Sequence, residues 1–503
     1  MKIFFRVDSS SLIGSGHVVR CLTLAKSLKK EGAKCKFICK DYDSSFNKII
    51  KTQGFEVIVL TNSNKLYKDF FNKNWEEDAR QTINVIREEK IDWLVVDHYG
   101  LDIRWEKKLR PYTKKIMVID DLANRKHDCE LLLDQNLVDN FEKRYQNFLP
   151  KYANTLLGPK YALLQSEYKN KHLIASPRTG SVKNILIYFG ATDKNNLTEL
   201  IIKEFNKLNR EDIFLNVVIS SNSSQIKKIK NESKKNKKIK LFTNLSSLAP
   251  LMLKADISIG ACGTTSWERC CLGLPAIVIT LADNQRQIAK ELHKRKVIYW
   301  LGHYDNIKIN LISKKIEKLI NQNLKNWSNR CKSITDGFGT QRVTSILKLN
   351  SRTKLKARVA RIEDSKLILT WANDPLVRLN AFNSKIINNK THNEWFNFRL
   401  NNSKKCVILI IETLEKIPIG QVRFEKKNRK WFINYSVASF ARKKNISSKL
   451  LKTAIKKFKK NKTFKLIAEV KKDNIASCKV FEKIGFIKGF AKKNNSSIFK
   501  YQL

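Results

Sequence analysis

The first thirty residues place a strand, a loop of small residues and a helix in immediate succession. Residues 2–8 (KIFFRVD) are largely apolar, β-branched or aromatic, a composition that predicts a buried strand. The loop is SSSLIGSGH, residues 9–17, and from Val18 the apolar residues recur every three or four positions, which predicts an amphipathic helix. In open α/β proteins this order places free N–H groups and a helix N-terminus at the ligand-binding edge of a parallel sheet. The stretch therefore predicts an α/β fold with a site at this loop.

His17 lies where the loop meets the helix and is the best candidate in the sequence for a catalytic base. The alternative is a histidine that only caps the helix, because Gly-Ser-Gly before a helix is common in open α/β sheets. The loop does not match the dinucleotide-binding fingerprint, since no third glycine follows at the required spacing.

Composition limits the class of protein. The 503 residues suffice for about three domains. No stretch approaches the roughly 20 apolar residues of a membrane helix, and the sequence starts directly in a strand rather than in a signal peptide. We therefore expect a cytoplasmic protein with no membrane partner. Ten scattered cysteines without a CxxC pair fit buried thiols, and the seven histidines show no metal-ligand spacing, so no metal is expected.

The net charge of +52 raises the question of a nucleic-acid partner. The basic residues are mostly lysines spread along the whole chain, and the densest run, residues 227–240, has no interleaved aromatic side chains for base stacking. We expect no specific nucleic-acid partner. A positive field would nevertheless attract anionic nucleotide sugars and coenzyme A.

Acidic residues end several predicted strands of the first 150 residues. Asp8 ends the first strand, Asp97 ends the strand 93–97 just before Tyr99, and Asp120 and Asp121 end the strand 115–121. Polar groups at the carboxyl ends of parallel strands face the ligand crevice, although each could instead cap a helix or form a turn. As a set they predict one rim of a site.

A second nucleotide-like pattern occurs between residues 184 and 285. A strand from residue 184 runs into a loop at Gly190, and the strand 257–260 is followed by Gly263-Thr264-Thr265 at a predicted helix start, where free N–H groups suit a diphosphate. One turn later Glu268 can present a carboxylate to a ribose diol. The strand 276–279 and then Asn284-Gln285 follow. The alternative is a plain helix cap packed on a core.

The string Arg6-x-Asp8-x5-Gly14-x-Gly16-His17-x2-Arg20-Cys21 resembles the N-terminus of the UDP-sugar hydrolases of pseudaminic acid biosynthesis, and the resemblance extends over about residues 1–345. Those enzymes release UDP from UDP-2,4-diacetamido-2,4,6-trideoxy-β-L-altropyranose and share a GT-B-like fold with the lipid II glycosyltransferases. The resemblance implies that His17 is catalytic, with Asp8 assisting it. It implies substrate or UDP binding by Gly14, Gly16, Arg20, Asp97, Tyr99, Gly190, Gly263, Thr264, Thr265, Glu268, Asn284 and Gln285.

The last third of the chain differs in pattern. After a polar segment at residues 351–356, two helices precede a run of antiparallel strand signals, and the string Asn474-x2-Ser477…Phe481-Glu482-Lys483-x-Gly485-Phe486 follows. This order resembles the GNAT acetyltransferases, and the arrangement Trp371-x-Asn373…His392-x2-Trp395 resembles the branch that contains the 4-amino-sugar N-acetyltransferases. The resemblance implies acetyl-CoA binding by Val437, Arg442, Asn445, Ser447, Asn474, Ser477 and Phe481.

Three positions depart from the GNAT pattern. Asn445 and Ser447 stand where the pyrophosphate loop usually has glycine or alanine, and Phe481 stands where a tyrosine is the usual general acid. Asn tolerates the left-handed conformation better than most residues, and Ser still donates from its backbone, so acetyl-CoA binding can survive. The alternative is a degenerate domain kept for stability or assembly.

The sequence thus predicts two Rossmann-like GT-B-type domains, residues 1–155 and 156–348, followed by an α+β GNAT domain at 352–503. The expected function is acetylation of a 4-amino UDP-sugar and hydrolysis of the product by a monomer or weak dimer. One alternative is a GT-B glycosyltransferase that uses a UDP-sugar donor beside a degenerate GNAT domain. Another is a non-catalytic nucleotide-sugar or RNA-binding protein.

Overall fold

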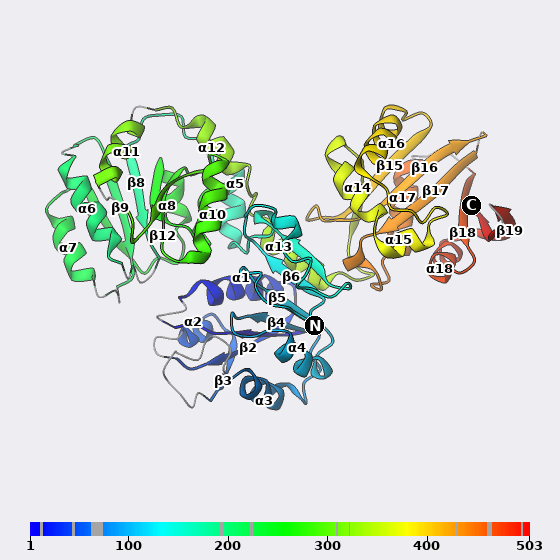
Figure 1. Ribbon diagram of the computed structural model, residues 1–503, viewed down its shortest axis with the longest axis horizontal. Helices are drawn as coiled ribbons and strands as arrows, with labels where there is room; N and C mark the ends of the chain where they lie inside the picture. The colour runs from blue at the N-terminus through cyan, green and yellow to red at the C-terminus, as the bar shows by residue number, and fades with distance from the viewer. Residues whose placement is uncertain are drawn as a thin grey trace. The chain divides into compact units, whose positions relative to one another are not determined.

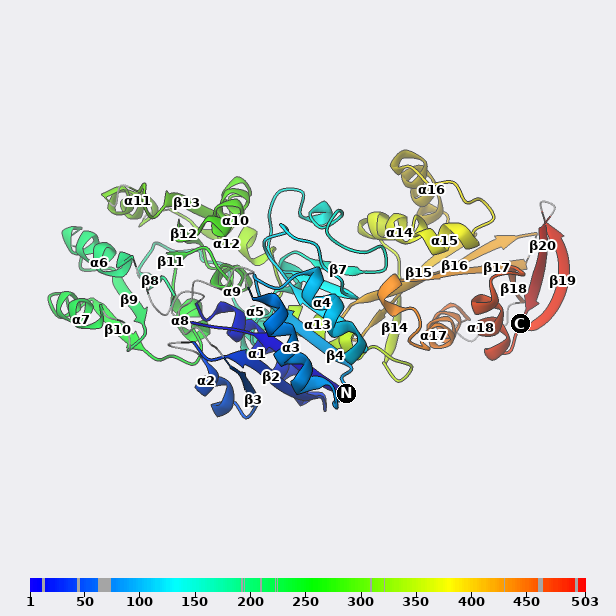
Figure 2. The same ribbon diagram turned by 60° about the horizontal axis from the view of Figure 1, so that its bottom comes forward.

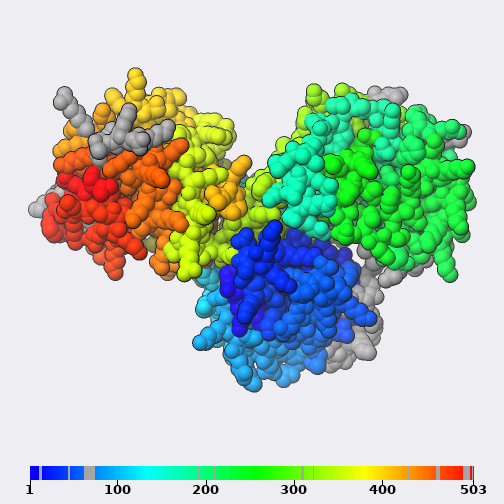
Figure 3. Space-filling view, turned by 180° about the vertical axis from the view of Figure 1, so that it is seen from behind, coloured from blue at the N-terminus to red at the C-terminus, as the bar shows by residue number. Residues whose placement is uncertain are grey.

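The computed structural model describes residues 1–10, 14–42, 46–61, 74–190, 193, 195–208, 210–221, 223, 225–307, 310–320, 322–428, 430–459, 465–493 and 496–503. The chain forms two compact units, residues 1–343 and 344–503. Figure 1 labels their helices and strands, and Figure 3 shows the packed atoms of each unit coloured by residue number.

The first unit begins with a seven-stranded parallel sheet in the order β3-β2-β1-β4-β5-β6-β7. The order reverses between β1 and β4, so the carboxyl ends of these two strands border a crevice of the kind that holds ligands in open α/β sheets. Figure 1 shows α1 and the helices α3 and α4 beside this sheet. The strands are Lys2–Val7, Lys34–Lys40, Glu56–Leu60, Trp93–Asp97, Ile116–Ile119, Leu131–Asp134 and Asn154–Leu157, and the helices α1 to α5 are Gly16–Lys30, Asn47–Thr52, Trp75–Ile86, Ile103–Leu109 and Ser166–Ile174.

A second parallel sheet follows, in the order β10-β9-β8-β11-β12-β13, with its reversal between β8 and β11. Its central strands Ile257–Ala261 and Ala276–Thr280 are short apolar runs buried on both faces, as expected when helices cover a parallel sheet. The strands β8 to β13 are Asn184–Tyr188, Phe214–Ile219, Ile239–Thr243, Ile257–Ala261, Ala276–Thr280 and Ile298–His303. The helices α6 to α13 are Leu197–Lys207, Ile226–Lys234, Ala249–Lys254, Thr265–Cys271, Asp283–Lys294, Asn310–Ile320, Lys325–Lys332 and Gly339–Lys348.

The second unit is built on a mixed sheet in the order β14-β15-β16-β17-β18-β20-β19. The strand pairs are antiparallel except β17 and β18, which pair in parallel. Figure 2 shows α14 and α16 on one side of β15 to β17 and α17 on the other. The strands β14 to β20 are Leu355–Val359, Cys406–Thr413, Pro418–Lys427, Lys430–Val437, Leu466–Lys471, Ile487–Lys493 and Ser496–Gln502. The helices α14 to α18 are Ser365–Ala372, Pro375–Asn380, Asn389–Asn401, Ser447–Lys459 and Ile475–Lys483.

The predicted fold class is confirmed: two Rossmann-like domains of GT-B type precede a mixed α/β domain of GNAT type. One predicted element is shorter than expected. The strand predicted over 115–121 is limited to Ile116–Ile119. No helix in the described part of the chain is long and apolar enough to cross a membrane.

Candidate active site

His17 and Asp97 meet at the carboxyl edge of the first sheet. His17 is the second residue of α1, and Asp97 is the last residue of β4, the strand that neighbours β1. The His17 Nδ1 atom lies 2.5 Å from Asp97 Oδ1. Because an ionised carboxylate can only accept a hydrogen bond, Nδ1 carries the proton, and Nε2 is left as the ring atom that can take one up.

Arg20, one turn along α1, holds the same carboxylate from a second direction. Its Nε donates to Asp97 Oδ2 at 2.6 Å, and its Nη2 donates to Oδ1 at 2.6 Å. Burial acts to raise the pKa of Asp97, but the charges of Arg20 and His17 outweigh burial and hold this pKa well below its usual range. Asp97 is therefore ionised over the physiological pH range and fixes the orientation of His17.

Asp8 is committed to other partners. Both of its oxygens accept hydrogen bonds from Arg6, at 2.6 and 2.8 Å, and Oδ1 also accepts the Lys40 N–H at 2.7 Å. His98 Nε2 lies 3.2 Å from its Oδ2. Burial favours the neutral acid, but Arg6 and His98 hold the pKa of Asp8 far below its usual value. In the described part of the chain the carboxylate at hydrogen-bonding distance from His17 is Asp97, whereas Asp8 contacts Arg6, Lys40 and His98, so assistance by Asp8 stays a prediction.

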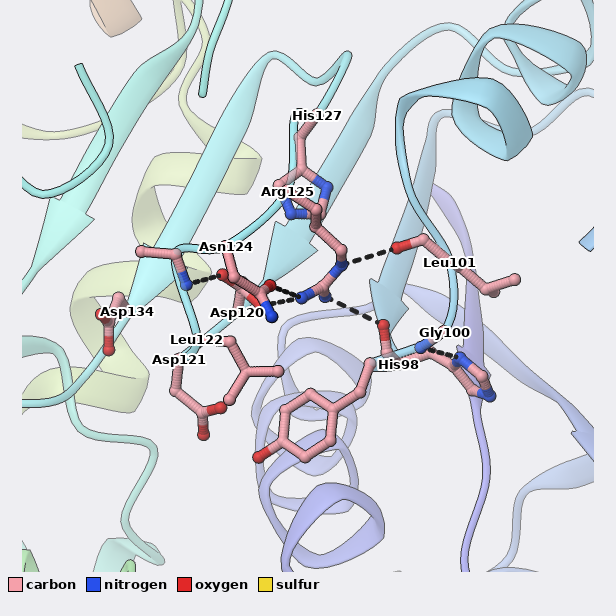
Figure 4. Close-up of polar contacts among 12 residues, drawn as sticks. His98, Gly100, Leu101, Asp120, Asp121, Leu122, Asn124, Arg125, His127 and Asp134 are labelled. Carbon is pink, nitrogen blue, oxygen red and sulfur yellow. Dashed lines mark hydrogen bonds and ion pairs between the residues drawn. The ribbon is translucent and has the colours of Figure 1, made fainter. Parts of the chain in front are cut away.

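A neighbouring arginine fastens the loop after β4 to the loop after β5 (Figure 4). Arg125 lies 2.9 Å from Asp120 Oδ1, and it donates to the carbonyl oxygens of Leu101 at 3.0 Å and His98 at 3.1 Å. Asp120 also accepts the Ala123 N–H at 2.9 Å. These bonds fix the backbone on both sides of Tyr99.

Tyr99 closes one side of the His17 ring. The two rings meet edge to face, with centroids 4.6 Å apart. Burial and the neighbouring Asp121 carboxylate raise the pKa of the Tyr99 phenol well above its usual value. Asp121 in turn accepts from Arg20 at 3.1 Å, and the Asn284 amide lies 3.4 Å from the Tyr99 hydroxyl. The predicted rim residues thus surround the His17–Asp97 pair.

The loop after β11 provides the predicted diphosphate position. Thr264 precedes α9 and its side chain forms no capping hydrogen bond, while Gly263 has no atom within 4 Å of where a Cβ would lie. Gly260 at the end of β11 has no such room, because a Cβ there would lie 2.2 Å from the Tyr188 carbonyl oxygen. The loop is therefore open on its outer side and closely packed beneath.

Glu268 lies one turn into α9 and is hydrogen-bonded to Tyr168, a residue that the sequence did not single out. Burial raises the pKa of Glu268 to about 7. The Gln285 side-chain oxygen accepts from the Leu281 N–H at 2.9 Å and so fastens its own loop. Gly190 has a φ of +98°, a conformation that favours glycine, while the neighbouring Ala191 lies outside the described residues.

The second unit contains an opening suited to a thioester cofactor. β17 and β18 pair only at Trp431↔Leu466 and Phe432↔Ile467 and then separate, and α17 begins at Ser447 beyond β17. Asn445 has a φ of +55°, the left-handed conformation that the family's glycine would adopt. The described geometry therefore fits a chain entering between two strands with its diphosphate at the start of a helix.

The other predicted acetyl-CoA residues surround this opening. Arg442 donates from Nε to the Val437 carbonyl at 3.0 Å and forms an ion pair with Asp374 at 2.9 Å, so it braces the loop. Asn474 caps α18 by accepting the Ser477 N–H at 3.2 Å. Phe481 is buried and packs edge-on against Tyr435 and Phe486. Tyr435 was missed by the sequence reasoning, because a lone tyrosine in an apolar strand carries no distinguishing signal.

Among the described residues, no group of three or more His, Cys, Asp and Glu side chains is placed to hold a metal ion. In the first unit, arginine side chains contact the rim carboxylates. Arg6, Arg20 and Arg125 each pair with at least one rim carboxylate.

Comparisons with known proteins define the two classes of domain. Residues 184–347 match the glycosyltransferase family 28 C-terminal domain, and residues 354–487 match the acetyltransferase (GNAT) domain. Together with the relatives below, these matches confirm the combination that the sequence resemblance predicted: a region similar to a UDP-sugar hydrolase fused to a GNAT domain.

Three relatives extend this result. The chain is 28% identical over 296 residues to the UDP-2,4-diacetamido-2,4,6-trideoxy-beta-L-altropyranose hydrolase of Campylobacter jejuni, covering 59% of this chain and 97% of the relative. It is 22% identical to the spore coat polysaccharide biosynthesis protein SpsG of Bacillus subtilis, over 69% of this chain and 98% of the relative. An uncharacterized protein of Methanocaldococcus jannaschii, MJ1062, is 26% identical over the full length of both chains. These similarities support an enzyme that processes sugar nucleotides.

Proposed function

We propose that the first unit hydrolyses UDP-2,4-diacetamido-2,4,6-trideoxy-β-L-altropyranose to UDP and the free sugar. The observation that carries this proposal is the His17–Asp97 pair at the switch between β1 and β4, with His17 Nε2 available to accept a proton. The similarity to the Campylobacter jejuni hydrolase supports the choice of substrate.

In the proposed reaction His17 Nε2 removes a proton from water as the water oxygen attacks the sugar C1. The bond between C1 and the phosphate oxygen breaks, through an oxocarbenium-like transition state by analogy with glycoside hydrolysis. Asp97 stabilises the imidazolium that forms. Backbone N–H groups at the Gly263 loop would hold the departing diphosphate, and Glu268 would accept hydrogen bonds from the uridine ribose.

We propose that the second unit acetylates the 4-amino group of the precursor UDP-sugar with acetyl-CoA. The opening between β17 and β18 and the left-handed Asn445 support the binding of the cofactor. When bound, acetyl-CoA supplies an activated acetyl group that a neutral amine can attack. Acetylation would precede hydrolysis, so one chain would carry two consecutive steps.

Transfer of the sugar to an acceptor other than water is the alternative, favoured by the match of residues 184–347 to a glycosyltransferase domain. Incubation of the full-length protein with the diacetamido UDP-sugar in H₂¹⁸O distinguishes the two. Hydrolysis at C1 predicts one ¹⁸O atom in the free sugar and none in UDP. Detection of ¹⁸O in UDP would contradict the proposal. The absence of free sugar when no other acceptor is added would also contradict it.

A pair of histidine variants tests the role of His17. We expect His17→Ala to lower UDP release at least a hundredfold, in line with the typical contribution of a general base. His293→Ala is the control, because His293 is an exposed residue of α10. A His17→Ala protein that retained full hydrolysis would remove this residue from the mechanism.

A further inference from the structure

The separation of β17 from β18 defines where an acyl chain can enter the second unit. The two strands pair at Trp431 and Phe432 and no further, so the following residues of β17, Ile433–Val437, border the gap. The role inferred for a side chain at this gap rests on the proposed acetyl transfer.

The position of α17 shows from which face of the sheet the cofactor would approach. Trp431 packs edge-on against Phe458 of α17, with ring centroids 4.9 Å apart. Because side chains alternate along a strand, Ile433 and Tyr435 share this face with Trp431. The start of α17 is the proposed diphosphate position, so the thioester end of the cofactor would lie on the Tyr435 side of the sheet.

The Tyr435 side chain is held in one orientation. Its hydroxyl lies 3.1 Å from the Ser477 Oγ in the first turn of α18, and its ring meets Phe481 edge-on with centroids 5.7 Å apart. Tyr435 is the titratable side chain of Ile433–Val437, and all five of these residues lie in the described part of the chain. Burial raises the pKa of its phenol, so the hydroxyl keeps its proton at physiological pH.

Acetyl transfer from a thioester to an amine needs a proton for the departing thiolate. A tyrosine at position 481 would supply one, but Phe481 has no hydroxyl. The Tyr435 hydroxyl lies beside Phe481 and one turn of α18 from it, next to Ser477. The Tyr435 phenol is therefore placed to donate the proton that residue 481 cannot supply.

We propose that Tyr435 is the general acid of acetyl transfer. The amine nitrogen bonds to the acetyl carbon, the carbon–sulfur bond breaks, and the thiolate takes the Tyr435 hydroxyl proton to leave as free coenzyme A. The amine nitrogen releases one proton, which returns to the phenolate through the Ser477 hydroxyl and water. The products are the acetamide and the thiol, and no proton is gained or lost overall.

The test follows thiol release by the full-length protein from acetyl-CoA with the 4-amino UDP-sugar of the proposed function. We expect Tyr435→Phe to lower kcat at least tenfold while KM for acetyl-CoA changes less than twofold. Tyr435→Phe/Phe481→Tyr should regain a substantial part of the loss, because it restores a phenol on the facing side of the contact. Lys456→Ala, an exposed residue of α17 remote from the start of that helix, should match the wild type.

The outcomes separate this inference from the function on which it rests. Wild-type protein that releases no thiol with this acceptor overturns both. An active wild type whose Tyr435→Phe variant keeps kcat within twofold, or loses rate only through a higher KM for acetyl-CoA, overturns the role of Tyr435 alone. An unchanged KM for acetyl-CoA in the same variant shows that the second unit has folded, because an unfolded unit would not bind the cofactor.

Discussion

Two side chains, those of His17 and Arg20, converge on the Asp97 carboxylate at the carboxyl edge of the first sheet. Asp97 accepts from His17 and, through both oxygens, from Arg20. Arg20 neutralises much of the carboxylate charge, and Asp97 orients the imidazole through its contact with Nδ1. Its role is thus that of a positioning residue, while His17 is the group that would touch water.

We therefore expect Asp97→Asn to lower kcat for UDP release by about two to four orders of magnitude, because the amide can present its N–H₂ to Nδ1 and favour the wrong tautomer. Combining it with His17→Ala should add little, since the two residues act as one unit. Steady-state kinetics of UDP release measure both effects. An Asp97→Asn variant with more than a third of wild-type kcat would contradict this account.

If Glu268 binds the uridine ribose as proposed, we expect the binding of UDP to depend on pH. Its pKa is raised to about 7, so the free protein holds a neutral acid below that pH and a carboxylate above it. Ribose hydroxyls donate best to the carboxylate, and we expect the affinity for UDP to rise as the pH increases through about 7 and then to level off. Calorimetric titration between pH 5.5 and 8.5 measures this change. Glu268→Gln should bind more weakly and lose this step, and a wild-type step of the opposite sign would contradict the assignment.

At the scale of single residues, the sequence predicted which strand ends share an edge of the sheet more completely than it predicted which side chains contact one another there. The rim residues Asp8, Asp97, Asp120 and Asp121 could be predicted because parallel strands end at a common edge, and His17 because it lies where a loop meets a helix. The role of Asp8 stays a prediction: Arg6, two residues away on the same strand, binds Asp8, and the contact of His17 with Asp97 depends on the pairing of β1 with β4, which no local pattern shows. Tyr168, the partner of Glu268, lies a hundred residues away from it and carries no local signal.

The strands β11 and β8, beneath the loop after β11, pack closely against each other at Gly260. Gly260 pairs with Tyr188 across β11 and β8, and an added Cβ would lie 2.2 Å from the Tyr188 carbonyl oxygen. We expect Gly260→Ala to lower the free energy of unfolding by about 1–3 kcal/mol, the usual cost of overpacking. Gly263→Ala, where the space is open, is the matched control and should stay within about 0.5 kcal/mol. Denaturant unfolding of both variants makes the comparison, and equal stabilities would refute it.

Most strands were predictable because each is a short apolar run between turn residues. Trp93–Asp97 and Ala276–Thr280 are examples. The last two strands, Ile487–Lys493 and Ser496–Gln502, were not predicted, because they are rich in lysine and serine and are defined by pairing with each other and with β18. Tertiary pairing rather than local preference determines such strands.

At the scale of the whole molecule, the proposed function assigns one reaction to each of the two units, so we expect the two reactions to be separable. In the presence of acetyl-CoA, His17→Ala protein given the 4-amino UDP-sugar should accumulate the acetylated UDP-sugar, because only the second step is blocked. Mass spectrometry of the nucleotide pool measures this intermediate. If the 4-amino compound remained untouched by this variant but was consumed by the wild type, the two reactions would not be independent.

The measurement that tests the central claim most directly is one incubation of the wild-type protein with the 4-amino UDP-sugar, with and without acetyl-CoA, followed by NMR. The account predicts UDP and free diacetamido sugar only when acetyl-CoA is present. Unchanged substrate in both samples, together with no cleavage of the acetylated UDP-sugar when it is supplied directly, would contradict the claim.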